Sequence, residues 1–291
     1  LVNLLAGRLG SVGRGEVWVF RRAGYEELFI KRVWGLGGES VRLLEGDLFI
    51  DGRRLVKERR QLDAVRAPLF TLQDFVRRRE APRGWRQPEP LHTGFRLPDG
   101  SVEKGDDPAT DVVWRLSVRA PARPWTVVLR LDDGSVPPAT VTLGTHKGRI
   151  VVGGREVVSS IGESSLGPLR LRTDRWTGIW ITNADRLFRV EVDGEEVARV
   201  PLDRRGGAPS CEVWWFDAEP RLRDFEVARD LVHAAAGQER VWRVGPDEVF
   251  FLGDNSARSR DSRSYGPVPR EHLVGRAFAV VWPPKRMRWI R

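Results

Sequence analysis

Residues 251–266 read FLGDNSARSRDSRSYG, a polar loop that directly follows an apolar run. Val249 to Leu252 are all apolar, so we expect a buried strand to lead into the loop. Gly253-Asp254-Asn255 predicts a turn, because glycine is conformationally free and Asx side chains hydrogen-bond to nearby backbone. After the turn, hydroxyl side chains alternate with one carboxylate and one guanidinium, in Ser259, Asp261, Ser262 and Arg263. Taken alone, the loop is typical of a polar surface with a local Asp–Arg pair.

The composition excludes several classes of protein. The chain has 291 residues and a formal net charge of +9, and nearly all of its basic residues are arginines. The length fits one large domain or two ordinary ones. The arginines alternate with Asp and Glu and form no dense basic arm, which argues against a nucleic-acid partner and leaves weak attraction to anionic lipid as the lesser alternative.

Metal, disulfide and histidine chemistry are also disfavoured. Cys211 is the only cysteine, and the four histidines are scattered along the chain. We therefore expect no disulfide, no zinc site, no histidine-based triad and no cofactor. No apolar run reaches 18 residues and no signal-peptide pattern is present. Because the chain begins with Leu1 and its only methionine is Met287, we expect it to be a piece of a longer product.

Lys31 is the residue that pairs most naturally with the loop. It lies inside the predicted strand 28–33, next to Phe29 and Ile30. Such a lysine can lay its stem on apolar surface and keep its ammonium in water. Alternatively, burial disfavours its charged form, so that the neutral amine can accept a proton from a serine hydroxyl. The residues of the strand alone leave both interpretations open.

The pattern divides the chain into parts. Residues 1–56 and 241–291 predict short strands with Asx-Gly and Gly-rich turns, and the last strand is expected over 272–282. Residues 57–108 lack periodicity and predict a connector with one short helix near 69–79. Residues 109–232 alternate with period two between turns, which predicts an inserted antiparallel β-sandwich, and residues 233–240 predict a linker. Within the sandwich, residues 176–200 resemble a hairpin of concanavalin- or laminin-G-like jelly rolls, a class that binds glycans or peptides.

The two ends of the chain together resemble the type I signal peptidases. The family's lysine box, Ile-Lys-Arg-Val before Gly-Leu-x-Gly-Glu, is matched by residues 30–39. Its later box, Gly-Asp-Asn, a spacer, Ser-x-Asp-Ser-Arg, aromatic-Gly and Val-Pro, is matched by residues 253–269. Residues 14–20 resemble the box upstream of the lysine. The resemblance implies a mainly β fold in which both chain ends form one signal-peptidase-type catalytic domain, with the sandwich inserted between them.

The resemblance also assigns roles to individual residues. Lys31 becomes the general base, and Ser259 becomes the hydroxyl that orients it. Five residues become supports of the site: Asp254, Asn255, Asp261, Ser262 and Arg263. Among them, Asp261 and Arg263 form a buried ion pair, and Asp254 and Asn255 shape the floor. The strand Leu28-Phe29-Ile30 is expected to pair with an extended substrate, next to a small apolar pocket that admits alanine-like side chains.

One departure from the family pattern concerns the nucleophile. The family's nucleophilic serine lies in a Ser-x-Met-x-Pro-type motif, followed by an apolar segment whose end Leu1-Val2-Asn3 resembles. The resemblance therefore places the nucleophile, its oxyanion hole and the membrane anchor before Leu1. Ser11, the only serine ahead of Lys31, has no motif around it, so we expect no nucleophile in this chain and no peptide cleavage by it alone.

The leading hypothesis is a serine endopeptidase that uses a Ser/Lys dyad to remove signal peptides from exported preproteins. The resemblance implies a place on the outer face of the bacterial cytoplasmic membrane. One alternative is a catalytically silent homologue whose sandwich binds a glycan or a protein. Another is a self-cleaving repressor-type protease, which is disfavoured because no helix-turn-helix pattern is present.

Overall fold

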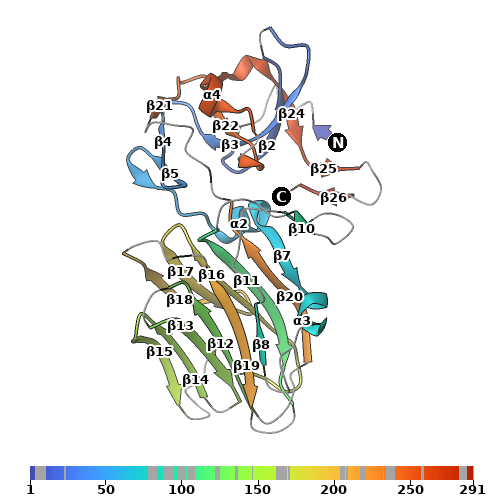
Figure 1. Ribbon diagram of the computed structural model, residues 1–291. Coiled ribbons are helices and arrows are strands. Elements are labelled where there is room, and N and C mark those ends of the chain that lie inside the picture. The colour runs from blue at the N-terminus through green and yellow to red at the C-terminus, as the bar shows by residue number, and fades with distance from the viewer. Residues whose placement is uncertain are drawn as a thin grey trace. The chain divides into compact units, whose positions relative to one another are not determined.

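The computed structural model contains predominantly antiparallel β-structure, arranged in two compact units (Figure 1). Unit 1 comprises 1–65 and 231–291, and unit 2 comprises 66–230. The structure describes residues 1–3, 11–22, 24–77, 84–87, 95–96, 102–103, 109–121, 125–134, 137–145, 147–161, 169, 171–203, 207, 209–216, 221–231, 233, 240–256, 259–281 and 287–290. No helix in these ranges is both long enough and apolar enough to cross a membrane.

Unit 1 contains a six-stranded sheet in the order β1-β24-β2-β3-β22-β23 and a four-stranded sheet in the order β21-β4-β5-β6. The strands of the first sheet are β1 (Val2–Asn3), β2 (Val17–Phe20), β3 (Phe29–Gly35), β22 (Glu248–Leu252), β23 (Val268–Pro269) and β24 (Leu273–Ala277). Those of the second are β4 (Ser40–Leu44), β5 (Asp47–Ile50), β6 (Arg53–Arg54) and β21 (Val241–Arg243). The remaining elements are α2 (Arg59–Val65), α4 (Ser262–Tyr265), a 3-10 turn (Arg270–His272), β25 (Ala279–Val280) and β26 (Arg288–Trp289).

The large sheet of unit 1 brings the two ends of the chain together. β3 lies between β2, its neighbour in sequence, and β22, which comes more than 200 residues later. Alternate residues of a strand point to opposite faces. On one face, Val33 of β3 packs with Trp18 of β2 and Phe251 of β22. On the other face, Trp34 packs with Phe250 and with residues of the smaller sheet.

Unit 2 is a sandwich of two six-stranded antiparallel sheets, in the orders β18-β17-β16-β11-β20-β7 and β15-β14-β13-β12-β19-β8. The first sheet contains β7 (Ala67–Thr71), β11 (Val112–Arg119), β16 (Thr177–Ala184), β17 (Leu187–Val192), β18 (Glu195–Pro201) and β20 (Arg221–Arg229). The second contains β8 (Gly84–Arg86), β12 (Thr126–Asp132), β13 (Ala139–Gly144), β14 (Lys147–Val152), β15 (Arg155–Ile161) and β19 (Ser210–Phe216). A helix α3 (Leu72–Arg77) and the pair β9 (Phe95–Arg96) and β10 (Val102–Glu103) complete the unit.

The period-two alternation of the sequence is reproduced in the burial of the sandwich strands, because inward side chains from both sheets fill one core. In β12, every second residue is buried between partly exposed neighbours. Trp85 of one sheet lies edge-on to Phe225 of the other, with ring centroids 4.8 Å apart. The expected fold class, mainly β with one domain formed by both chain ends and a sandwich inserted between them, is confirmed.

Two of the expected elements differ from the structure. Residues 57–108 are not only a connector, because β7 and β8 within them pair with β20 and β19 as strands of the sandwich. The strand expected over 272–282 is divided: β24 ends at Ala277, and β25 pairs with β26 instead of continuing the large sheet. Phe278 lies at the change: its N–H still bonds to the carbonyl of Leu1, next to β1, whereas its ring stacks on Trp289 of β26. Most of the expected linker 233–240 lies outside the described residues.

Candidate active site

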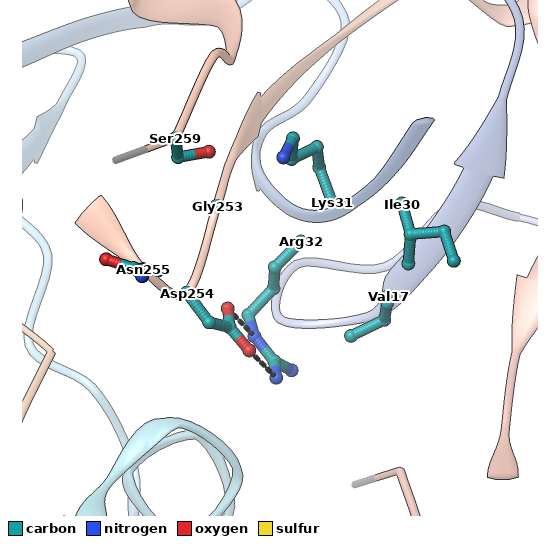
Figure 2. A pocket seen from close by; sticks show the side chains of 8 residues that line it. All are labelled: Val17, Ile30, Lys31, Arg32, Gly253, Asp254, Asn255 and Ser259. Atoms are coloured by element: carbon teal, nitrogen blue, oxygen red, sulfur yellow. Dashed lines mark hydrogen bonds and ion pairs between the residues drawn. The ribbon is translucent and has the colours of Figure 1, made fainter. Parts of the chain in front are cut away.

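A pocket of about 210 Å³ opens in unit 1 where β2, β3 and the loop after β22 meet (Figure 2). Its lining comes from two parts of the sequence that are far apart. The eight lining residues are Val17, Ile30, Lys31, Arg32, Gly253, Asp254, Asn255 and Ser259. The pocket therefore contains the lysine of the early segment and the serine of the late loop, two residues that the motifs of the sequence predict to meet.

The side chains of Lys31 and Ser259 point toward one another across Gly253 (Figure 2). Lys31 is half-buried, and it shares a face of β3 with Val33, which is fully buried. The stem of Lys31 thus leaves an apolar surface before its amine reaches the pocket. The hydroxyl of Ser259 is buried and has no hydrogen-bond partner among the described residues.

Gly253 is required between these two side chains for steric reasons. A Cβ atom at this position would lie 2.5 Å from the Cβ of Ser259 and 3.5 Å from the Cδ of Lys31. The first distance is far inside van der Waals contact. Only a residue without a side chain lets the serine approach the lysine from this direction.

Arg32, the neighbour of Lys31 in β3, forms a second link between the two segments. Its guanidinium donates two hydrogen bonds to the carboxylate of Asp254, at 2.8 and 3.0 Å (Figure 2). It also donates to the carbonyl oxygens of Gly15, at 2.6 Å, and Ala64, at 3.3 Å. Arg32 is buried whereas the side chain of Asp254 is half-exposed. The pair fixes Asp254 at the floor of the pocket, and Asn255 beside it has an exposed side chain.

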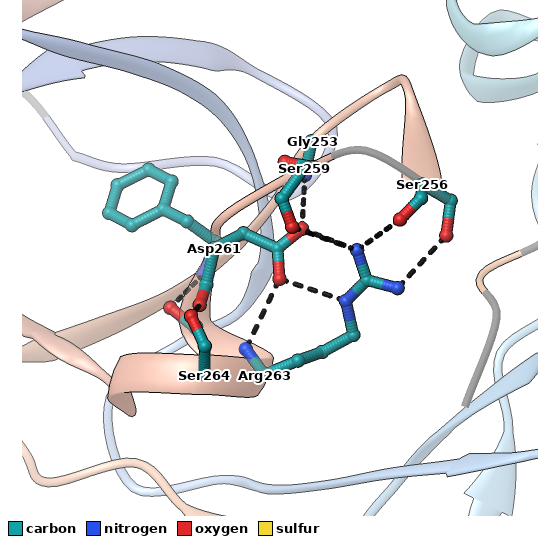
Figure 3. A network of polar contacts seen from close by, with 8 residues as sticks. Gly253, Ser256, Ser259, Asp261, Arg263 and Ser264 are labelled. Carbon is teal, nitrogen blue, oxygen red and sulfur yellow. Dashed lines mark hydrogen bonds and ion pairs between the residues drawn. The ribbon is translucent and has the colours of Figure 1, made fainter. Parts of the chain in front are cut away.

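Asp261 and Arg263 form a buried bidentate ion pair beneath the loop (Figure 3). Arg263 donates to Asp261 Oδ1 from Nε at 2.8 Å and to Oδ2 from Nη2 at 2.9 Å. The same carboxylate caps α4 by accepting from the N–H of Arg263, and it accepts from the N–H of Gly253 at 2.9 Å. Arg263 also donates to Ser256. Each oxygen of Asp261 therefore accepts two hydrogen bonds. One of the four donors is the N–H of Gly253, which the carboxylate holds in place.

Ser262 ties the loop to the end of the buried strand. Its hydroxyl accepts a hydrogen bond from the N–H of Phe251 at 3.0 Å, and the residue is fully buried. Ser262 and the Asp261–Arg263 pair do not line the pocket. They hold the two residues that do, Gly253 and Ser259, in their places.

One edge of β3 is left open next to the pocket. Pairing with β22 stops at Arg32, opposite Leu252, so Phe29 to Lys31 have a neighbour only on the β2 side among the described strands. Val33 directs its N–H and C=O toward β2, where they bond to Glu16 and Gly15. The backbone N–H and C=O groups of successive residues point to alternate sides of an antiparallel strand. The N–H and C=O of Ile30 therefore lie along the open edge of β3.

Comparison with known proteins matches both ends of the chain and extends from each end into unit 2. The family model described as "Signal peptidase, peptidase S26" matches residues 1–102 and 181–282, which is more than half of the chain. The chain belongs to the S26 signal peptidase family. The match includes every residue of the pocket.

Relatives within this family align over shorter stretches. Signal peptidase I of Pseudomonas fluorescens is 30% identical over 122 residues, which cover 36% of this chain and 40% of that protein. Thylakoidal processing peptidase 1 of Arabidopsis thaliana is 49% identical over 39 residues, 13% of this chain and 12% of that protein. Probable signal peptidase I-2 of Synechocystis sp. is 49% identical over 45 residues, 16% of this chain and 21% of that protein. The chain thus spans two fifths or less of the length of these relatives.

Solved structures resemble the chain only distantly. Sheep galectin-11 in complex with glycerol has a TM-score of 0.32 at 7% identity, and it covers 51% of this chain and 99% of its own. The carbohydrate-binding module CBM66 of Bacillus subtilis has a TM-score of 0.30 at 9% identity, over 44% of this chain and 80% of its own. At such TM-scores the likeness supports no conclusion about fold or ligand.

The structure brings together most of the expected site residues, but not all of them. Lys31, Ser259, Asp254, Asn255 and Ile30 line one pocket. Of the other two residues in the expected substrate strand, Leu28 is 53% exposed and does not line the pocket, and Phe29 packs against neighbouring aromatic rings. The pocket is also lined by Val17, Arg32 and Gly253, which were not expected there, since Gly253 was expected only as a turn residue. Only Arg32 offered a signal, as a second cation beside Lys31.

Proposed function

We propose that this chain supplies the general base and the substrate-binding edge of a Ser/Lys signal peptidase that removes signal peptides from exported preproteins. The observation that carries the proposal is the approach of Lys31 to Ser259 across Gly253, in a pocket beside the open edge of β3. A lysine can replace the histidine of a catalytic triad when it is held next to a hydroxyl.

In the proposed mechanism, the neutral amine of Lys31 takes the proton of the nucleophilic serine as that serine attacks the scissile carbonyl. The ammonium of Lys31 then donates the proton to the leaving amine, which releases the mature protein and leaves an acyl-enzyme. In the second half, Lys31 removes a proton from the water that hydrolyses the ester. The Ser259 hydroxyl, which has no other partner among the described residues, orients the amine through both halves.

We assign the nucleophile to a serine that precedes Leu1, on the resemblance of residues 1–3 to the segment that follows it in the family. Membrane anchoring, and a position on the outer face of the bacterial cytoplasmic membrane, belong to the same proposal. Arg32 supports the site from behind. Since Arg32 is bonded to Asp254 and to two carbonyl oxygens, its charge is directed away from the amine of Lys31.

The substrate is proposed to bind as an extra strand along β3. The N–H and C=O groups of Ile30 lie on the open edge, where an extended peptide can bond to them as in β-augmentation. The side chain of Ile30 is 58% exposed and also lines the pocket. A bound peptide would place alternate side chains against it, and a pocket of about 210 Å³ favours small residues such as alanine.

The test compares Lys31→Met and Ser259→Ala in the full-length protein, with cleavage of a preprotein that carries an Ala-x-Ala site as the readout. We expect Lys31→Met to abolish turnover and Ser259→Ala to lower it by roughly 10²–10⁴-fold, the usual size of general-base contributions. Ser11→Ala, at an exposed serine of unit 1 that does not line the pocket, is the control and should stay within about twofold, as expected for a substitution that leaves the site intact.

Three outcomes would contradict the proposal. Turnover that persists in Lys31→Met would show that Lys31 is not the general base. Turnover by residues 1–291 alone that depends on Lys31 would contradict the assignment of the nucleophile to an upstream serine. A full-length protein that binds the preprotein but never cleaves it would favour the catalytically silent homologue.

A further inference from the structure

Two arginines and two tyrosines form a cluster at the start of β3, outside the pocket. The guanidinium of Arg22 lies 3.9 Å from the ring centre of Tyr265 and 5.0 Å from that of Tyr25. The guanidinium of Arg260 lies 4.9 Å from the ring centre of Tyr25 and donates a hydrogen bond to its hydroxyl. Phe29 lies beneath the group, in edge contact with both tyrosines. Contacts between cations and aromatic rings hold the two guanidinium groups at fixed places.

The positive charge of this cluster is not balanced by the protein. Among the described residues, no carboxylate forms an ion pair with Arg22 or Arg260, although the exposed Glu26 and Glu27 follow Tyr25 directly. Nη1 of Arg22 and the hydroxyl of Tyr265 are both buried without a hydrogen-bond partner in the described part of the chain. Burial raises the pKa of that hydroxyl, so it stays protonated and can donate. The cluster thus carries two guanidinium charges with no carboxylate partner among the described residues, and the exposed Arg260 presents one of them at the surface.

The cluster lies close to the proposed substrate path. Phe29 and Lys31 are two residues apart on the same face of β3, a separation of about 7 Å in a strand. Arg260 directly follows Ser259, which lines the pocket. The contact between Arg260 and Tyr25 therefore joins the loop after β22 to the turn before β3, the two segments that flank the open edge.

We propose that the Arg22–Tyr25–Arg260 cluster binds a carboxylate of the peptide that lies along β3, and that the protein prefers substrates with Asp or Glu at that position. The inference rests on the proposed substrate strand. From the spacing of the strand, the acidic residue lies within about three residues of the scissile bond. An anionic membrane is the less favoured occupant, because Glu26 and Glu27 flank Tyr25 at the surface and would be repelled by it.

The test uses the full chain and fluorescent Ala-x-Ala peptides in which one residue at a time, over three positions on either side of the scissile bond, is Asp or Asn. Binding is measured by anisotropy at low and high salt. We expect one Asp position to bind about 3- to 10-fold more tightly than its Asn isostere, an advantage that added salt reduces. Arg260→Gln should bring the two peptides within twofold, and Arg260→Lys should retain part of the preference.

Arg243→Gln is the control variant, because Arg243 is an exposed arginine of the same unit, on β21. It removes one positive charge and should leave the Asp preference unchanged. Equal binding of Asp and Asn peptides at every position, or a preference that survives Arg260→Gln, would overturn the inference and leave the proposed function standing. Arg260→Gln that weakens binding to phosphatidylglycerol vesicles without changing peptide preference would assign the cluster to lipid instead. Failure of both peptides to bind would overturn the proposed substrate strand together with this inference.

Discussion

Replacing Asp261 by asparagine should destabilise unit 1 strongly although the two side chains have the same shape. Each oxygen of the Asp261 carboxylate accepts two N–H groups: Oδ1 from the backbone and Nε of Arg263, and Oδ2 from Arg263 Nη2 and Gly253 N. Whichever way its amide is oriented, an asparagine places its NH₂ group against two N–H donors, which then lose their hydrogen-bond acceptor. It also removes the carboxylate charge that pairs with the buried guanidinium of Arg263, whose side chain is only 6% exposed.

The expected loss follows from breaking one partner of a buried ion pair, which costs about 3–5 kcal/mol. In urea this corresponds to a midpoint shift of roughly 1–3 M for a unit of this size. Because two units can unfold separately, the assay is hydrogen exchange with mass spectrometry across a urea series. Peptides from 240–281 then report on unit 1, and peptides from 171–203 report on unit 2. The free energy of unfolding should fall in the first set only.

Glu196→Gln in β18 is a matched control. The Glu196–Arg199 pair is also bidentate, with distances of 2.8 and 2.9 Å, but its side chains are 36% and 44% exposed. The hydrogen bond from Arg199 lowers the pKa of Glu196. Solvent screening limits the contribution of this exposed pair to the free energy of unfolding to about 0.2–1 kcal/mol. The reasoning would be refuted if Asp261→Asn cost no more than Glu196→Gln, because burial would then not determine the strength of these pairs.

Three further predictions concern other parts of the chain. Gly253→Ala should displace Ser259 and weaken binding of an Ala-x-Ala peptide, at a cost in stability of about 1–3 kcal/mol; unchanged peptide affinity would contradict the steric role of the glycine. Burial lowers the pKa of His233 well below 6.5, so the unfolded chain alone takes up a proton as the pH falls below that value. The free energy of unfolding should therefore decrease below pH 6.5 by up to about 1.4 kcal/mol per pH unit, and urea titrations of His233→Gln should show no such slope. Trp85→Ala should cost unit 2 about 3–5 kcal/mol, because the ring is fully buried against Phe225; a loss no larger than that of the exposed Val157→Ala would show that β8 does not belong to the core.

The sequence predicted the site better than it predicted the boundaries of the fold. Lys31 and Ser259 were expected to meet because each lies in a long motif, and the structure places both in one pocket. The link between Arg32 and Asp254 was not expected, since one sequence does not show which of two adjacent cations finds a carboxylate 222 residues later. Gly253 was interpreted as a turn residue. The structure gives a second reason for glycine at this position, because a Cβ atom there would collide with Ser259, which lies beyond the turn.

Two strands in the middle of the chain, β7 and β8, were not predicted, and both were missed for the same reason. β8 has three residues and β7 has five, so neither shows enough alternation to be recognised from period alone. Each is an edge strand that exists because a longer partner, β19 or β20, is already in place. Their identity is thus set by tertiary pairing, which the sequence of the short strand does not encode.

The place where the sandwich is inserted explains how unit 1 can accommodate it. The chain leaves unit 1 after Val65 and returns at Leu231, and both residues are buried in the same apolar cluster, with Trp34 and Phe250. Unit 1 thus closes its own core around the two ends of the insertion. The entropic cost of closing a loop grows only with the logarithm of its length, so a long insertion at such a point costs little more than a short one. Trp34 and Phe250 belong to the two strands, β3 and β22, that lead into the pocket. The cluster that closes the insertion therefore also fixes the strands that bring Lys31 and Gly253 together.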